Sequence, residues 1–184
     1  MSKKLKLLKQ LKLAQKLCAV YDNADDVRSF AVGYIVAVGE DDYIMETINA
    51  SGQFDGFACK LVEDIISVET DSQYLTREEN LMRARGYARP DRSAFGTDCL
   101  NDLLQYAAKN RKICFVELDA SGCWDVAGFV VRADEEMFSV ECVDAYGKAD
   151  GLRHIDVDRV YEVRCDGAAE RDRETLFLAN EEKN

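Results

Sequence analysis

The chain has little of what most catalytic and cofactor sites require. It holds one proline, one tryptophan and one histidine in 184 residues. With His154 as the single histidine, any Ser-His-Asp chemistry would have to pass through it, and no nucleophile stands out as its partner. The sequence has no phosphate-binding glycine motif, zinc-knuckle spacing or nucleophile elbow. These absences predict a protein that is not an enzyme and that binds no cofactor.

Long apolar runs are also missing. No stretch approaches the roughly 18 apolar residues of a membrane-spanning helix, and the lysine-rich start lacks the unbroken apolar core of a signal peptide. The seven cysteines form no CxxC pair. Dispersed cysteines in odd number are typical of free thiols, with oxidative cross-linking or metal capture as the alternatives. We therefore expect a cytoplasmic protein with buried free thiols and no membrane span.

Positive charge is scarce and unevenly placed. The formal net charge is −11, yet the only charged residues among the first sixteen are lysines. The rest of the chain is therefore more acidic than the total, and an acidic surface repels the phosphate backbone of RNA. The lysines could form a solvated helix face or contact nucleic acid, an anionic membrane or the acidic body of another chain. They are Lys3, Lys4, Lys6, Lys9, Lys12 and Lys16.

What the chain does contain is the same sequence twice. Residues 33–84 align with residues 128–179 at a constant shift of 95 positions without a gap. An upstream match at a shift of 96 aligns Cys18 with Cys114. Such a duplication predicts architecture more than chemistry. Identical pairs include Gly33 and Gly128, Val36 and Val131, Glu46 and Glu141, Gly52 and Gly147, and Asp55 and Asp150.

The repeat predicts two units. We place them at residues 1–88 and 96–184, with a linker at residues 89–95 that contains the single proline, Pro90. Units of this size bury a modest share of their surface, so docking of the two halves or association with other chains would add useful burial.

Comparison of the copies predicts which strand face is buried, because a core position is apolar in both copies, whereas the residue type at a solvent position differs between them. The period of two assigns alternate residues of the third strand to the core. The inward positions are Tyr43, Met45 and Thr47 in the first copy and Phe138, Val140 and Cys142 in the second.

Each unit is predicted to contain a helix, five short strands and a second helix. Five short antiparallel strands with strongly bent second and third members are most economically closed as a small barrel, which removes exposed edges. The expected fold is mainly β with flanking helices: two tandem five-stranded small barrels, each preceded and followed by a helix.

This order resembles the Sm-like family of the Hfq and Lsm type, an SH3-like small barrel. The residues that carry the resemblance are a glycine in the second strand (Gly33, Gly128), an acidic turn before an aromatic (Tyr43, Phe138) and a closing apolar strand. The resemblance covers most of each unit and implies tandem barrels of that type.

The residues with which Sm-like proteins read RNA do not carry over. The family uses a basic residue from the loop before the last strand and an asparagine after the third strand. Here the corresponding loops, residues 61–64 and 156–159, are mostly acidic, and Asn49 is matched by Asp144. The sequence therefore disfavours RNA binding, although it remains the main alternative function.

The two copies differ on the outer strand face, where the first is the more apolar. Hydrophobic side chains at such positions need a cover, either a helix of the same chain or another subunit. We therefore expect a homo-oligomer. The candidate interface residues are Ala37, Ile44 and Phe54, which are aligned with Arg132, Ser139 and Ala149 of the second copy.

Two weaker patterns have simpler structural explanations. His154, Asp156 and Asp158 would share one face of a strand, a spacing that suits a divalent ion, but the other copy does not repeat them. The repeated Asp55-Gly56 and Asp150-Gly151 pairs fit hairpins better than a ligand-binding loop. The sequence thus predicts a non-catalytic binding or assembly protein, with an RNA-binding Sm-like protein, and more weakly an enzyme with a site between the units, as alternatives.

Overall fold

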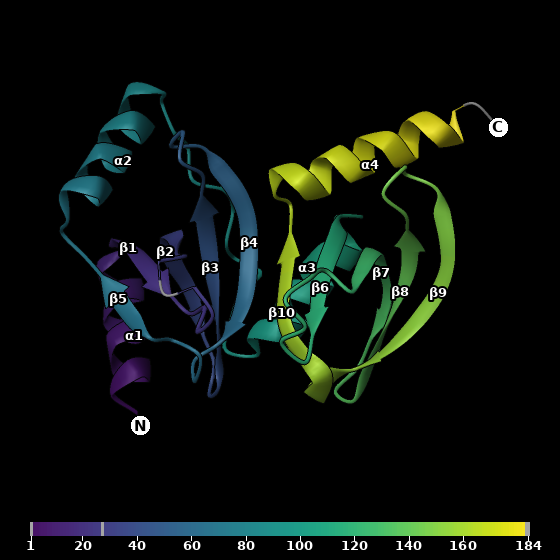
Figure 1. Cartoon of the computed structure of the whole chain (residues 1–184), viewed down its shortest axis with the longest axis horizontal. Helices are drawn as coiled ribbons and strands as arrows, with labels where there is room; N and C mark the ends of the chain where they lie inside the picture. The colour runs from purple at the N-terminus through teal and green to yellow at the C-terminus, as the bar shows by residue number, and fades with distance from the viewer. Residues whose placement is uncertain (1, 27, 183–184) are drawn as a thin grey trace. The chain divides into compact units, whose positions relative to one another are not determined.

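The computed structural model describes residues 2–26 and 28–182, and the chain divides into two compact units, Met1–Cys99 and Leu100–Asn184 (Figure 1). Unit 1 begins with a helix, continues with five strands and ends with a second helix and an irregular segment. Its elements are α1 (Lys3–Ala14), β1 (Leu17–Tyr21), β2 (Ala31–Val38), β3 (Asp42–Ile48), β4 (Phe54–Leu61), β5 (Ser67–Glu69) and α2 (Gln73–Ala84).

Unit 2 repeats this order, and its first helix begins at the last residue of unit 1. A short 3-10 helix precedes its final strand. Its elements are α3 (Cys99–Lys109), β6 (Ile113–Leu118), β7 (Val126–Ala133), β8 (Met137–Val143), β9 (Ala149–Asp156), η1 (Val157–Arg159), β10 (Val160–Cys165) and α4 (Ala168–Glu181). The predicted order of helix, five strands and helix is therefore present twice.

The strands of each unit form an antiparallel sheet with the same neighbour order. In unit 1 the order is β5-β1-β2-β3-β4, and in unit 2 it is β10-β6-β7-β8-β9. Register shifts also recur at equivalent places, between Ile35 and Ala37 in β2 and between Val130 and Arg132 in β7. A second equivalent pair lies between Glu46 and Ile48 in β3 and between Glu141 and Val143 in β8. The duplication seen in the sequence thus extends to the register of the strands.

The expected closure into barrels is not found among the described residues. The first and last strands of each order, β5 and β4 or β10 and β9, are not paired with each other within their unit. In unit 1, β5 has only three residues, and all three pair with β1. Each unit is therefore an open, five-stranded antiparallel sheet with helices, and the fold is mainly β.

The first two predicted inward residues of the third strand are buried in each unit. Tyr43 and Met45 on β3, like Phe138 and Val140 on β8, are fully buried. In unit 1 this face packs against α1, where Leu8 belongs to the same core cluster. The sheet separates this cluster from a second one on its other face.

The third inward position of each copy is less uniform. Thr47 is buried, and its hydroxyl donates a hydrogen bond to the carbonyl of Asp55 at 2.7 Å. Cys142, its counterpart, is half-buried. A polar side chain is therefore tolerated at this position because the neighbouring strand supplies an acceptor.

The opposite face of each sheet carries the second helix. In unit 1, Leu75 and Met82 of α2 pack with Ile48 of β3. In unit 2, Phe177 of α4 packs against the cluster that contains Phe129, with ring centroids 5.1 Å apart. Each unit thus buries apolar residues on both faces of its sheet.

The seven cysteines are free thiols, as expected, and five of them are buried. Burial raises the pKa of the Cys18 thiol to about 12. Within residues 2–26 and 28–182, no helix is long and apolar enough to cross a membrane. The same residues contain no group of three or more His, Cys, Asp or Glu side chains that could hold a metal ion.

Candidate functional site

The most highly organised polar contact in unit 1 is centred on Glu46 of β3, whose side chain is fully buried. Its carboxylate accepts hydrogen bonds from the Tyr87 hydroxyl at 2.8 Å and from Nε and Nη2 of Arg89 at 3.0 and 2.9 Å. Arg92 Nε lies 3.8 Å away. A buried carboxylate is tolerated when it is paired and hydrogen-bonded in this way.

The partners of Glu46 all come from the irregular segment that follows α2. We name residues 87–95 the covering segment. Its Arg89 guanidinium also lies 3.9 Å from the centroid of the Tyr34 ring, and its Phe95 ring packs at 4.8 Å from Phe57 of β4. Residues 89–95, which the sequence analysis expected to be a linker, are therefore packed on the sheet of unit 1.

The buried site keeps Tyr87 protonated. Burial, and then the hydrogen bond to Glu46, raise the pKa of Tyr87 above its usual range. Burial also raises the pKa of Tyr34, although the Arg89 guanidinium acts in the opposite direction. A neutral phenol can donate to the carboxylate, so the Tyr87 hydroxyl helps to hold the covering segment on the sheet of unit 1.

The equivalent face of unit 2 has no such cover among the described residues. Glu141, the counterpart of Glu46, is exposed, and Leu152, the counterpart of Phe57, is 55% exposed whereas Phe57 is fully buried. The pairing is the same in both units, since Glu141 lies opposite Phe129 and Leu152. Equivalent residues are thus buried in one copy and open to solvent in the other.

The candidate interface residues are placed differently from what the sequence indicated. Ala37 and Ile44 are fully buried in the chain, and Phe54 is half-buried with its ring 5.1 Å from Phe57. Ala37 and Ile44 therefore offer no surface to another subunit. The outer strand face of the first copy is more apolar than that of the second because Ala37 and Ile44 are buried within the chain.

The six N-terminal lysines lie on or just after α1, and several already have partners in unit 1. Lys4 donates to the Glu63 carbonyl at 2.6 Å, and Lys16 forms an ion pair with Asp71 at 2.5 Å, which lowers the pKa of Asp71. The group is thus divided between contacts with the sheet and solvent-facing positions such as Lys3 and Lys6.

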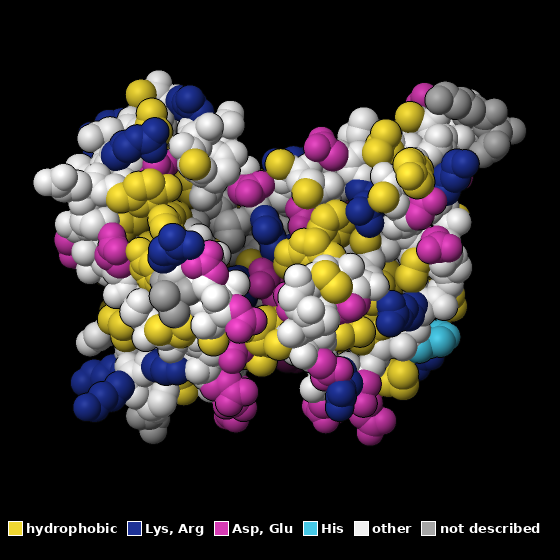
Figure 2. Space-filling view, viewed as in Figure 1, with side chains coloured by type: hydrophobic (Ala, Val, Ile, Leu, Met, Phe, Trp, Pro, Cys, Tyr) yellow, Lys and Arg dark blue, Asp and Glu magenta, His cyan; other side chains and the backbone are white. Residues whose placement is uncertain are grey.

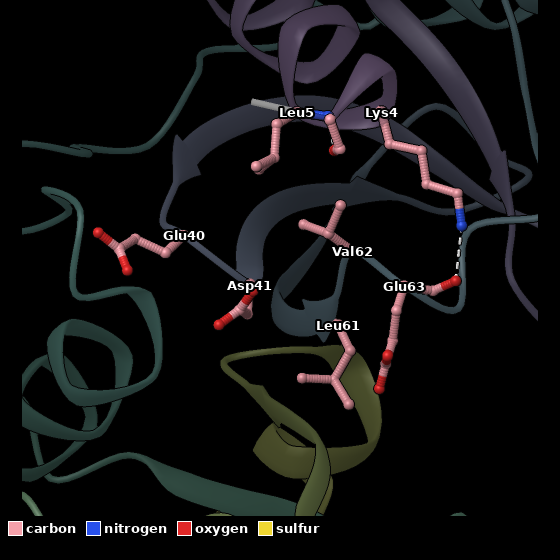
Figure 3. A pocket seen from close by; sticks show the side chains of 8 residues that line it. Lys4, Leu5, Glu40, Asp41, Leu61, Val62 and Glu63 are labelled. Atoms are coloured by element: carbon pink, nitrogen blue, oxygen red, sulfur yellow. Dashed lines mark hydrogen bonds between the residues drawn. The ribbon is translucent and has the colours of Figure 1, made fainter.

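A cavity of about 690 Å³ lies beside the N-terminus of α1. Figure 3 shows Lys4 on one side of it, reaching the backbone oxygen of Glu63, with Glu40 and Asp41 on the other side. The loop at residues 61–64 thus presents an acidic side chain next to a lysine of the same unit. This arrangement does not favour a phosphate group.

His154 of β9 has a neighbour that the sequence did not reveal. Its Nδ1 lies 2.8 Å from Oγ of Ser139 on β8, directly across the strand pair. The carboxylate of Asp156 is instead used to accept from the backbone N–H of Asp158. The three residues of the suggested metal site are therefore not assembled, and the exposed His154 pairs instead with the buried Ser139.

Two strands leave one backbone edge unpaired. Within the described residues, β5 pairs with β1 alone and β9 pairs with β8 alone. Every residue of β9 except Ile155 is exposed. Figure 2 shows acidic side chains gathered at the end of unit 2 that carries the β7–β8 turn, where β9 ends. The sequence predicted closed barrels, in which these strands would have no unpaired edge; in the described part of the chain both outer edges are unpaired.

No protein-family model, curated protein or solved structure matches this chain.

Proposed function

We propose that the protein is a non-catalytic assembly protein whose copies associate head to tail, with the β9 edge of one copy pairing with the β5 edge of the next. The observation that carries this proposal is the unpaired outer edge of β9, which is eight residues long and exposed along almost its whole length. A long strand edge without a cover is a template for pairing with another chain.

The surroundings of the two edges are complementary in charge. Beside β5, a cavity of about 200 Å³ is lined by Lys3 and Lys4 of α1 together with Ile66, which is 50% exposed. Near the end of β9, the exposed Asp156 lies opposite Met137, and the Glu136 carbonyl accepts from the next backbone N–H after the strand. The lysines beside β5 and the carboxylate of Asp156 at the end of β9 would attract each other in a contact between these two edges.

The interface is heterologous because it joins two different edges. Such contacts produce a closed ring when the rotation between subunits closes and an open filament when it does not. Sm-like proteins build rings by joining strand edges between subunits, and a tandem chain would contribute two such units per subunit. Kinship with that family is part of this proposal, supported by the helix and five strands found in each unit.

RNA binding is the less favoured function. Lys4 and Lys16 are already engaged by Glu63 and Asp71, and the loop at residues 61–64 is acidic. The remaining lysines on α1 would have to outweigh an otherwise acidic chain.

The proposal is tested by sedimentation velocity over a range of protein concentration, in low and high salt. We expect a species heavier than the 20.7 kDa chain that loses mass as salt screens the charged contacts. Ile66→Glu beside β5 should reduce the assembly. Leu13→Glu, at an 87% exposed position of α1 away from that cavity, is the matched control and should leave it intact. A monomer at tens of micromolar would contradict the proposal.

A further inference from the structure

The two units present the same three-strand row of side chains, and its carboxylate and apolar positions are covered in unit 1 and exposed in unit 2. In unit 1 the row runs from Tyr34 through Glu46 to Phe57, which are paired across β2, β3 and β4. In unit 2 the paired residues at the same places are Phe129, Glu141 and Leu152, on β7, β8 and β9. We name these the unit 1 row and the unit 2 row. Both consist of an aromatic ring, a carboxylate and an apolar side chain.

The unit 1 row shows which groups such a surface binds. Arg89 places its guanidinium over the Tyr34 ring at 3.9 Å and donates two hydrogen bonds to Glu46, while Phe95 covers Phe57 at 4.8 Å. Arg89 therefore contacts two members of the row, and Phe95 contacts the third. An arginine fork is well suited to this place because it pairs with a carboxylate and stacks on an aromatic ring at the same time.

The unit 2 row keeps the chemistry of its counterpart and is open at two of its three positions. Glu141 and Leu152 are exposed, while Phe129 is largely covered by its contact with Phe177. Arg111 lies with its guanidinium 5.7 Å from the centroid of the Phe129 ring, considerably farther than Arg89 lies from Tyr34. The carboxylate and the apolar position are thus both accessible to an incoming group.

The next row along the same strands shows the same contrast. Ala37, Ile44 and Cys59 are buried in unit 1. At the paired places in unit 2, Arg132 and His154 are exposed, and only Ser139 between them is shielded. The difference between the units is therefore a whole patch of sheet face, extending over at least two rows.

We propose that the unit 2 row is a docking site for an extended peptide segment of a partner protein that carries an arginine followed by an aromatic residue, as the covering segment does. The arginine of the partner pairs with Glu141 beside the Phe129 ring, and its aromatic side chain packs on Leu152. Charge selects the arginine, since Glu141 is an exposed carboxylate at the place where Glu46 binds Arg89. The site uses side chains on the sheet face, including Leu152 of β9, whereas the proposed assembly contact uses the outer backbone edge of β9.

The probe for this site is a synthetic peptide with the sequence of residues 87–96, labelled and titrated with the full-length chain while its fluorescence anisotropy is measured. Saturable binding is expected. Glu141→Gln should weaken it by about tenfold or more, because it removes the charge that holds the guanidinium. The control Glu135→Gln removes the same charge from an exposed position of the β7–β8 turn and should leave the affinity unchanged.

Two further measurements keep the result specific to the row. Leu152→Asp should also weaken binding, and a peptide in which glutamine replaces the residue equivalent to Arg89 should bind about tenfold more weakly. The variants lie at exposed positions, and circular dichroism checks that they remain folded.

Several outcomes would overturn the proposal. These are absence of saturable binding, equal affinity for the chain with and without Glu141→Gln, and equal affinity of the two peptides. Competition between the peptide and self-association would assign the face to a second copy of the chain and would also overturn it. Loss of assembly in Ile66→Glu with peptide binding retained would separate this site from the proposed edge contact.

Discussion

Arg89 donates hydrogen bonds from Nε at 3.0 Å and from Nη2 at 2.9 Å to the two carboxylate oxygens of Glu46, a residue 43 positions earlier in the chain. This two-point contact attaches the covering segment to the sheet of unit 1. It also turns a strand position that looks like a polar outer face in the sequence into a buried ion pair. The corresponding carboxylate in unit 2, Glu141, lies in solvent.

Removing the charge of Glu46 should therefore destabilise the protein far more than the same change in Glu141. Glu46→Gln or Arg89→Ala leaves a buried charge without its full partner, and such changes cost about 3–5 kcal/mol. Glu141→Gln alters an exposed side chain and should stay within about 0.5 kcal/mol. Urea unfolding followed by circular dichroism measures both. Equal effects of the two glutamine variants would show that the Glu46 contact contributes nothing.

The glycine of the second strand is required by close backbone contact in both units. A Cβ added to Gly33 would lie 2.0 Å from the Glu46 carbonyl oxygen, and one added to Gly128 would lie 2.0 Å from that of Glu141. Gly33→Ala and Gly128→Ala should each cost about 1–3 kcal/mol because strand backbone must shift. Thermal unfolding tests this, with Ser67→Ala at the exposed first residue of β5 as a control. Unchanged melting temperatures would contradict the steric argument.

The repeat and the inward faces of the strands could be predicted because they depend on local patterns. Tyr43 and Val140 alternate with outer residues at the period of a strand, and the two copies support each other. Whether Ile44 is exposed depends instead on residues far away in the chain. The segment after residue 84 lies outside the gapless match, and its arginines and Phe95 were the only sequence signal that one unit has additional residues to cover its sheet.

Barrel closure and the strand edges could not be predicted for a related reason. Closure depends on where the last strand of a unit pairs, and β5 is too short to pair along more than three residues of β1. Similarly, the contact between His154 and Ser139 follows from the register of β8 and β9, which no spacing in the sequence specifies. The pattern along one strand predicts which of its faces is buried, whereas the pairing between strands determines which residues meet in a site.

An acidic substitution in the buried face should unfold either unit. Met45 and Val140 are fully buried at equivalent positions, so Met45→Asp and Val140→Asp each place an uncompensated charge in the core at a cost of several kcal/mol, on the order of 3–5. Met137→Asp provides the control, because Met137 is 44% exposed on the same strand as Val140. Chemical denaturation that ranks Met137→Asp as equally damaging would contradict the assigned faces.

RNA should bind weakly at physiological salt, because the chain has a formal net charge of −11 and two of the N-terminal lysines are already engaged. A gel-shift titration with single-stranded RNA in low and physiological salt measures this. Any residual binding should fall steeply with salt and disappear when the exposed Lys3, Lys6 and Lys9 are replaced by glutamine. Sub-micromolar binding that survives those replacements would contradict the prediction.

The free thiols should react in the order of their exposure, with Cys123 first and Cys18 among the last. Cys123 is exposed, whereas Cys18 is buried and burial raises its pKa from 9.0 to about 12, so the unreactive neutral thiol persists at pH 8. Because the pKa of Cys18 is higher in the folded state, the neutral thiol makes its full contribution to the free energy of unfolding below pH 9. This contribution is lost as the pH rises toward 12. Alkylation with iodoacetamide followed by peptide mass spectrometry resolves each site, and urea provides the unfolded reference in which all seven thiols react. Labelling of Cys18 as fast as Cys123 in the native protein would show that α1 does not hold that core closed.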